Sequence, residues 1–279
     1  MTAAKNVPAS VRARLMNLAR ADNVDFQSML TRYALERVLY RLSVSAWTSQ
    51  FLLKGALLFD VWFDQPLRPT RDIDLLGFGP ADLEYLKAVF EDVSARPCDD
   101  GMDYDAASVC VAKIRKDAGY EGVRVTLIGW LDGARCTVQV DVGYGDAVTP
   151  AAETVLFPVV LDDMPPATLR AYPVYTVVAE KYQAIVVLGM ANTRMKDYFD
   201  LWFLARHAKI DRTTLAQAIK ATFDRRKTSV PTTVPLGLST TFAADPVKRQ
   251  QWNAFLSKNK LSAADLMEVV DILRGLVGV

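Results

Sequence analysis

Two alternating apolar runs joined by a tight turn constrain the fold of this chain more than any other feature. Residues 122–130 (GVRVTLIGW) and 134–142 (ARCTVQVDV) read as β-strands, because apolar and polar side chains alternate along both. Asp132-Gly133 between them is a hairpin signal. Strands joined by so short a turn must be antiparallel, so the sheet is at least partly antiparallel.

The other periodic segments predict a mixture of strands and helices. Strands are expected at 71–78 and 107–115, and helices at 8–22, 25–45, 80–94, 176–190, 195–208, 211–224 and 262–276. Pro8 suits the first turn of the first helix, and Ser262 would be the N-cap of the last. We expect the arginines of helix 25–45 to face away from its apolar stripe or to sit at its edge.

A Pro-rich connection at 158–175 marks the best candidate domain boundary. We therefore predict an α+β protein of two domains. Residues 1–160 would hold N-terminal helices and a mixed β-sheet, and residues 161–279 would form a helical C-terminal domain.

Composition excludes several classes of protein. The net charge of +1 argues against a strongly basic nucleic-acid binder, and 51% apolar side chains over 279 residues supply a sizeable core. His207 is the only histidine, so His-based triads and multi-His metal sites are excluded. Cys98, Cys110 and Cys136 show no paired spacing, which fits a reducing cytoplasm. We expect no signal peptide at the N-terminus and no membrane span.

Basic residues nevertheless gather in two segments. The first, within residues 1–45, holds Lys5, Arg12, Arg14, Arg20, Arg32, Arg37 and Arg41. The second, within residues 206–227, holds Arg206, Lys209, Arg212, Lys220, Arg225, Arg226 and Lys227. Both can be solvated helix faces, or they can contact an RNA backbone.

The stretch RPTRDIDLL (68–76) places two like charges on one face of a predicted strand. Side chains alternate along a strand, so Ile73 and Leu75 face the core while Asp72 and Asp74 share the opposite face, about 7 Å apart. Asp141 would likewise lie opposite the core-facing Val138 and Val140. Carboxylates without histidine suit a hard cation, above all Mg²⁺, which would also offset their repulsion.

The segment before this strand adds a possible phosphate site. Lys54-Gly55 interrupts an apolar run, and a glycine turn would let backbone N–H groups approach a phosphate. This layout is plausible for phosphoryl or nucleotidyl transfer. The competing interpretation of Asp72 and Asp74 is a solvated strand edge.

Three further charged residues lie on the predicted helices 176–190 and 195–208. Taken alone, Lys181 can be a lysine whose amino group reaches solvent. Asp197 and Asp200 can be part of an ion-pair cluster on the helix surface.

Several motifs in order resemble a known family. They are LTRYALERVLYRLSVSAWTSQ, FLLKGALLFDVWFDQPLRPTRDIDLLGFG, VQVDVGYGD and VVAEKYQAIVVLGMANTRMKDYFDLWFLAR. Together they resemble the AbiEii/AbiGii toxins, nucleotidyltransferases with the polymerase-beta-like fold, over residues 25 to 208. The resemblance implies the nucleotidyltransferase fold, with a C-terminal domain that completes the active site.

The resemblance also implies roles for individual residues. Asp72 and Asp74 would hold Mg²⁺ or Mn²⁺, with Asp141 as a third ligand after the wider superfamily pattern. Lys181 would contact the nucleoside triphosphate. The motif KDYFD would supply a further essential carboxylate, Asp200 as first choice and Asp197 as second.

Residues beside these motifs are candidates for nucleotide binding, namely Lys54, Gly55, Thr70, Arg71 and Arg194. The wider superfamily has Gly-Ser at the phosphate turn, whereas this chain has Gly55-Ala56. The missing hydroxyl contact would then come from Thr70 or from a backbone N–H. Thr70 is also a plausible phosphorylation site, because a phosphate there would repel the triphosphate.

By the same resemblance, the chain would be a toxin of a toxin–antitoxin or phage-defence system with a cognate antitoxin encoded nearby. It would transfer a nucleotide from an NTP to RNA, with the tRNA 3′ end as acceptor. The alternatives are a nucleotidyltransferase that modifies a protein or a small molecule, and a catalytically silent module that binds RNA or the antitoxin.

Overall fold

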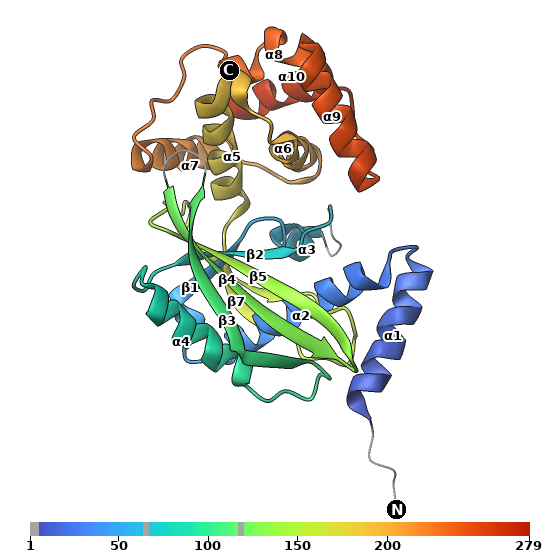
Figure 1. Cartoon of the computed structure of the whole chain (residues 1–279). Coiled ribbons are helices and arrows are strands. Elements are labelled where there is room, and N and C mark those ends of the chain that lie inside the picture. The colour runs from blue at the N-terminus through green and yellow to red at the C-terminus, as the bar shows by residue number, and fades with distance from the viewer. Residues whose placement is uncertain (1–5, 64–66, 117–119) are drawn as a thin grey trace, which may run out of the picture. The chain divides into compact units, whose positions relative to one another are not determined.

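The computed structural model describes residues 6–63, 67–116 and 120–279 (Figure 1). The basic residue Lys5 and the N-terminal segment 1–5 of the signal-peptide prediction lie outside the described residues. The chain divides into two compact units. The sheet unit comprises residues 1–145 and 153–171, and the helical unit comprises residues 146–152 and 172–279.

The sheet unit holds seven strands in the order β3-β4-β5-β2-β1-β7-β6. Their bounds are β1 Phe51–Lys54, β2 Asp72–Gly77, β3 Asp103–Lys116, β4 Tyr120–Leu131, β5 Ala134–Tyr144, β6 Glu153–Phe157 and β7 Ala167–Ala171. Strand β2 runs parallel to β5, and β1 runs parallel to β7, while the other neighbours are antiparallel. The predicted mixed sheet is confirmed, as is the hairpin at Asp132-Gly133, where both residues have positive φ.

The helices of the sheet unit are α1 Val7–Ala21, α2 Phe26–Ser43, α3 Leu58–Phe63 and α4 Leu83–Ala95, with a short 3-10 turn η1 at Thr48–Gln50. Of these, α2 packs on β5 and β7, and α4 packs on β3 and β4. Phe51 of β1 contacts Phe90 of α4, and Phe51 lies on the same face as Ile73 and Leu75 by the strand register. Helices α2 and α4 also contact each other, so both lie on this core face. The opposite face carries Asp72 and Asp74.

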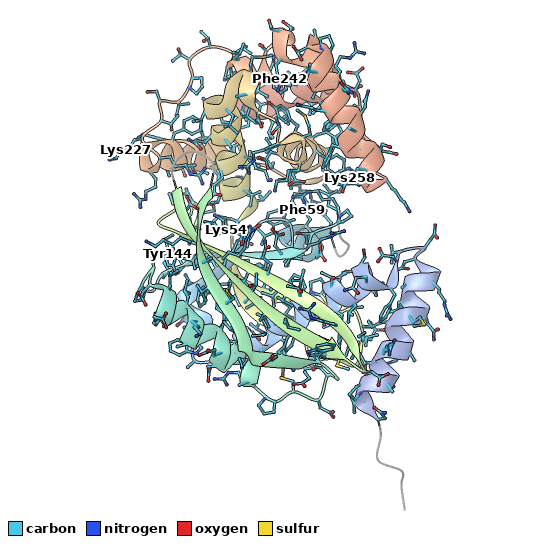
Figure 2. All side chains as sticks on the ribbon, viewed as in Figure 1. Lys54, Phe59, Tyr144, Lys227, Phe242 and Lys258 are labelled. Atoms are coloured by element: carbon cyan, nitrogen blue, oxygen red, sulfur yellow. The ribbon has the colours of Figure 1, made fainter. Side chains whose placement is uncertain are left out.

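The helical unit contains α5 Val174–Leu188, α6 Met195–His207, α7 Arg212–Arg225, α8 Thr240–Ala244, α9 Pro246–Asn259 and α10 Leu266–Val277, with 3-10 turns η2 Gly189–Ala191 and η3 Leu236–Leu238. Aromatic residues form much of its core. Tyr198 stacks on Phe242, which is labelled in Figure 2, and its hydroxyl donates to the carbonyl of Gly237 at 2.8 Å. Trp252 of α9 is buried beside Phe199 of α6.

Several elements differ from the sequence prediction. Strands β1, β6 and β7 and helices α3, α8 and α9 were not predicted, and β7 lies in the segment 158–175 that we read as a connection. The sheet therefore continues past residue 160, and the sheet unit ends at Ala171. Ser262 is not the N-cap of the last helix. Asp265 is, because its carboxylate accepts from the backbone N–H groups of Met267 and Glu268.

The prediction for the arginines of α2 was wrong for two of them. Arg37 and Arg41 are fully buried. Arg41 makes two hydrogen bonds to Asp100, at 2.5 and 3.1 Å, and Arg37 pairs with Glu36 and donates to the carbonyl of Pro165. A buried guanidinium is tolerated only when it is paired, and both arginines have a carboxylate partner. They belong to the interior, so the first basic cluster is smaller at the surface.

One stretch of the helical unit, Val174–Ala191, has the length and apolar composition of a membrane-crossing helix, the single such stretch within the described ranges. It carries Glu180 and Lys181, and 44% of it is buried in the structure. A core helix has the same properties, so the absence of a membrane span stays a prediction.

Candidate active site

Four charged residues from neighbouring strands form one transverse row on the face of the sheet opposite Ile73 and Leu75. Lys54 of β1 is paired with Asp74 of β2, Asp74 with Asp141 of β5, and Asp141 with Arg124 of β4. Paired residues in a pleated sheet project to the same side, with strands about 4.8 Å apart. The register therefore brings Asp141 beside Asp74, on the polar face of β5 that the alternation predicted.

Asp72 lies on the same face, two residues from Asp74 along β2. It is paired with Gln139 in the next row. The hydroxyl of Thr70 donates to Oδ1 of Asp72 at 2.7 Å. Thr70 is therefore placed to hold the Asp72 carboxylate. Arg71, the other candidate in this turn, is exposed.

Arg124 is the site residue that sequence reasoning missed. Its Nε and Nη2 donate to the two carboxylate oxygens of Asp141 at 2.8 and 3.0 Å. This hydrogen bonding raises the pKa of Arg124 against the opposing effect of burial, and the charges of Asp141, Asp72 and Asp74 raise it further. The charges of all three carboxylates therefore act on the Arg124 guanidinium. The available signal was the alternation of β4, in which Arg124 stands between Val123 and Val125 and shares the polar face.

Gly55 follows the row at the end of β1, where Lys54 is labelled in Figure 2. Its φ of +77° is a conformation that favours glycine, and a Cβ there would lie 2.3 Å from Oδ2 of Asp74. Gly55 therefore leaves room for the Asp74 carboxylate, which fits the predicted glycine turn beside the carboxylates.

The donors in this site fit a hard cation such as Mg²⁺. Asp72 and Asp74 supply carboxylate oxygens on one face, and Mg²⁺ is commonly bound by one or two carboxylates together with substrate phosphates. Among residues 6–63, 67–116 and 120–279, no three His, Cys, Asp or Glu side chains are close enough to hold one ion. Asp141 is engaged by Arg124, although each carboxylate oxygen keeps a second lone pair.

A second charged cluster lies within the helical unit. Nζ of Lys181 on α5 is 2.7 Å from Oδ1 of Asp197 and 2.8 Å from Oδ2 of Asp200, both on α6. Nε of Arg194 lies 2.7 Å from Oδ2 of Asp197. The structure thus brings together all four residues predicted in this part of the chain.

Burial makes this cluster different from the predicted alternative of a helix-surface ion pair. Asp197 and Asp200 are fully buried, and the side chain of Lys181 is 13% exposed. Burial raises the pKa of Asp197, but the charges of Lys181 and Arg194 and the hydrogen bond from Lys181 outweigh it, so the net pKa is lowered. The Asp197 carboxylate is therefore held ionised inside the protein by Lys181 and Arg194.

Comparison with known structures supports the fold. The chain is similar to the crystal structure of JHP933 from Helicobacter pylori, with 16% identity, a TM-score of 0.51 and coverage of 90% of each chain. A second H. pylori crystal structure, described as a candidate nucleotidyltransferase, shares 18% identity at a TM-score of 0.47, over 91% of this chain and 95% of that one. No curated protein matched the chain.

The sequence itself matches a family profile over most of its length. Residues 37–271 match the profile described as nucleotidyl transferase AbiEii toxin, type IV toxin–antitoxin system. That range includes the carboxylate row, Gly55 and the Lys181 cluster. The chain therefore belongs to the AbiEii family of nucleotidyl transferase toxins of type IV toxin–antitoxin systems.

Proposed function

We propose that this toxin transfers a nucleotide from an NTP to an RNA acceptor, the tRNA 3′ end being the expected target, with Mg²⁺ or Mn²⁺ as cofactor. The observation that carries the proposal is the row Lys54–Asp74–Asp141–Arg124 with Asp72 beside it. It places carboxylates between two cations on one face of the sheet. Polyphosphate chemistry needs both, because a metal and positive side chains must together neutralise the phosphates.

Each residue of the row has a role in this proposal. Asp72 and Asp74 hold the divalent ion, and Thr70 fixes Asp72 through its hydrogen bond. When bound, the ion would neutralise and orient the triphosphate. Lys54 and the backbone of the Gly55 turn face the β- and γ-phosphates. Asp141 is proposed as the third ligand through its remaining lone pairs, which requires the three carboxylates to draw closer together than they lie in this structure.

The reaction is a displacement at the α-phosphorus. The acceptor hydroxyl oxygen forms a bond to that phosphorus, and the bond from the phosphorus to the bridging oxygen breaks. Pyrophosphate leaves, and the hydroxyl proton passes to a nearby carboxylate or to water.

The Lys181 cluster is proposed to serve the same reaction. Lys181 would contact the triphosphate, and Asp200, with Asp197 as second choice, would be the further essential carboxylate. Arg71 and Arg194 are proposed as additional nucleotide contacts. The support for this part is the family match, which includes the whole cluster.

The RNA acceptor is supported by exposed basic residues of the helical unit. Arg226 of the second basic segment is not among them, because it binds Asp146, Glu180 and Gln183. The exposed members are Arg206, Lys209, Arg212, Lys220, Arg225 and Lys227, although Lys220 pairs with Asp224. Contacts of this kind to an RNA backbone weaken steeply with salt. A cytoplasmic location, where NTPs and tRNA are found, is part of the proposal. The type IV family implies a cognate antitoxin.

Thr70 is proposed as a regulatory phosphorylation site. Its hydroxyl lies 2.7 Å from the Asp72 carboxylate, so a phosphate there would place more negative charge where the triphosphate must bind. A Thr70→Glu variant should lose activity, while Thr70→Ser should keep it. Full activity of Thr70→Glu would contradict the proposal.

The proposed function is tested by measuring transfer of labelled nucleotide to candidate acceptors. Purified protein is incubated with each α-labelled NTP, with and without Mg²⁺, and with tRNA, total protein or a small-molecule extract as acceptor. We expect label in tRNA only when Mg²⁺ is present. Label in protein and not in RNA would overturn the tRNA acceptor. Growth inhibition unchanged by Asp72→Ala would identify a silent binding module.

A further inference from the structure

One edge of the Arg124 guanidinium is hydrogen-bonded to Asp141, and the other edge is not. Nε and Nη2 are taken by Asp141, while in the part of the chain that the structure describes Nη1 donates no hydrogen bond. The Arg124 side chain is 40% exposed, so Nη1 is accessible to a ligand. An arginine held in this way loses little conformational freedom when it binds a phosphate.

The register places Arg124 at the opposite end of the row from Lys54. Three strand spacings, about 14 Å, separate the two backbones. Asp74 and Asp141 lie between them on β2 and β5. A group bound at Arg124 is therefore on the far side of the carboxylates from the Gly55 turn.

The geometry of nucleotidyl transfer assigns these two sides to different reactants. The attacking oxygen must approach the α-phosphorus in line with the leaving pyrophosphate. When the pyrophosphate lies at Lys54 and Gly55, the acceptor must come from the side of β5 and β4. We propose that Arg124, anchored by Asp141, binds the phosphodiester next to the acceptor hydroxyl. This inference rests on the proposed function and adds the residue that recognises the acceptor.

This role favours a nucleic-acid acceptor over a protein. A terminal nucleotide in RNA has a phosphodiester close to its 3′-hydroxyl, whereas a serine or tyrosine hydroxyl has none. Arginine suits the position because its planar guanidinium can bind a carboxylate by one edge and a phosphate by the other. Lysine has a single charged nitrogen and cannot do both in a fixed geometry.

Direct binding tests the inference without turnover. A fluorescent single-stranded RNA oligonucleotide with a 3′-hydroxyl is titrated with the full-length protein, at fixed Mg²⁺ and without NTP. We expect Arg124→Ala and Arg124→Lys each to weaken binding, about tenfold for the alanine variant. The slope of log affinity against log salt should fall by about 0.7, the value for one phosphate on a single strand.

A modified RNA and a matched variant sharpen this test. When the last phosphodiester is replaced by a neutral methylphosphonate, wild type and Arg124→Ala should bind equally. Arg135→Ala is the control, because Arg135 is an exposed arginine on the same face of β5 about 20 Å from Asp141. Like wild type, the Arg135→Ala variant should bind the methylphosphonate RNA more weakly than the unmodified RNA. Thermal unfolding of each variant establishes that it is folded.

Equal binding of the unmodified RNA by wild type and both Arg124 variants would overturn the inference, as would a wild type indifferent to the methylphosphonate. Neither result would contradict nucleotide transfer, which the labelling assay tests separately. Conversely, a wild type that binds RNA through Arg124 but transfers no label would contradict the proposed function and leave the Arg124 contact standing.

Discussion

Asp74 and Asp141 lie directly opposite each other on the parallel strands β2 and β5. Like charges in such a pair repel, and here Lys54 and Arg124 flank them in the same row. A sheet that only had to fold would not need this arrangement. A sheet that holds polyphosphate does, because its carboxylates can bind a cation and its basic residues can bind phosphate.

Added Mg²⁺ should therefore stabilise the protein through this row. At a concentration ten times its Kd, Mg²⁺ is expected to add about 1.4 kcal/mol to the free energy of unfolding. Asp74→Asn removes a ligand and should abolish this increment. Thermal unfolding with and without MgCl₂ measures it, and Asp103→Asn, at an exposed position on β3, should respond like wild type. An unchanged response of Asp74→Asn would place the cation elsewhere.

Gly55→Ala should damage the site beyond its cost in backbone strain. Gly55 and Gly133 have φ of +77° and +79°, so alanine at either position should cost about 1 kcal/mol of stability. Only at Gly55 does the new Cβ meet a side chain, Oδ2 of Asp74 at 2.3 Å, whereas nothing lies within 4 Å at Gly133. Urea unfolding should show a larger loss for Gly55→Ala than for Gly133→Ala, because only the first meets a side chain, and nucleotide transfer should fall only for Gly55→Ala. Equal activity of the two variants would mean that the contact with Asp74 has no functional role.

Asp197→Asn should destabilise the protein strongly near neutral pH. Asp197 is buried between Lys181 and Arg194, and breaking a buried ion pair from one side costs about 3–5 kcal/mol. Its pKa is lowered from 3.8, so its stabilising contribution is present above that value and is lost as the pH falls through the lowered pKa. Urea unfolding at pH 7 and below pH 4 measures this difference.

The control for Asp197 is an exposed ion pair. Asp224→Asn removes the partner of Lys220 on α7 and should cost less than about 1 kcal/mol at either pH. A small effect of Asp197→Asn at pH 7, similar to that of the control, would show that the cluster is solvated. Because Lys181→Ala removes the cation that Asp197 and Asp200 share, its loss of activity has to be judged against Lys181→Arg.

Asp60→Asn should have the opposite effect on stability. Burial raises the pKa of Asp60 to about 6, only partly opposed by Arg32 at 3.5 Å. The folded state therefore favours the protonated acid, and stability is lost as the pH rises from 3.8 through about 6. Asparagine should recover about 3 kcal/mol at pH 7 and almost nothing below pH 4. A stability difference that does not vary with pH would contradict the burial of this carboxyl.

Local patterns predicted much of the site, because the alternation along a strand determines which face of the sheet each of its residues occupies. Alternation placed Asp72 and Asp74 on one face and Asp141 on the polar face of β5, and Asp132-Gly133 predicted the hairpin. The register between strands is not local. It alone decides that Asp141 lies between Asp74 and Arg124, so the role of Arg124 could not be read from the chain.

Burial of charge was the other feature beyond sequence reasoning. Arg41 looks like a surface residue on α2 until Asp100, 59 positions away, is brought against it. Similarly, Asp197 and Asp200 share a helix face whether buried or exposed, and only the packing of α5 against α6 shows that they enclose Lys181. Strand β7 (ATLRA) does alternate between buried and exposed residues, but it lies in the Pro-rich segment that we read as a connection.

Transfer of α-labelled nucleotide to tRNA by wild type, Asp72→Ala and Asp74→Asn in the presence of Mg²⁺ tests the central claim most directly. The account predicts label in the RNA, pyrophosphate released in equal amount, and losses of at least about a hundredfold in both variants, because the metal ligands act on the transition state. Label transferred by either variant at the wild-type rate would contradict the assignment of the carboxylate row as the catalytic site.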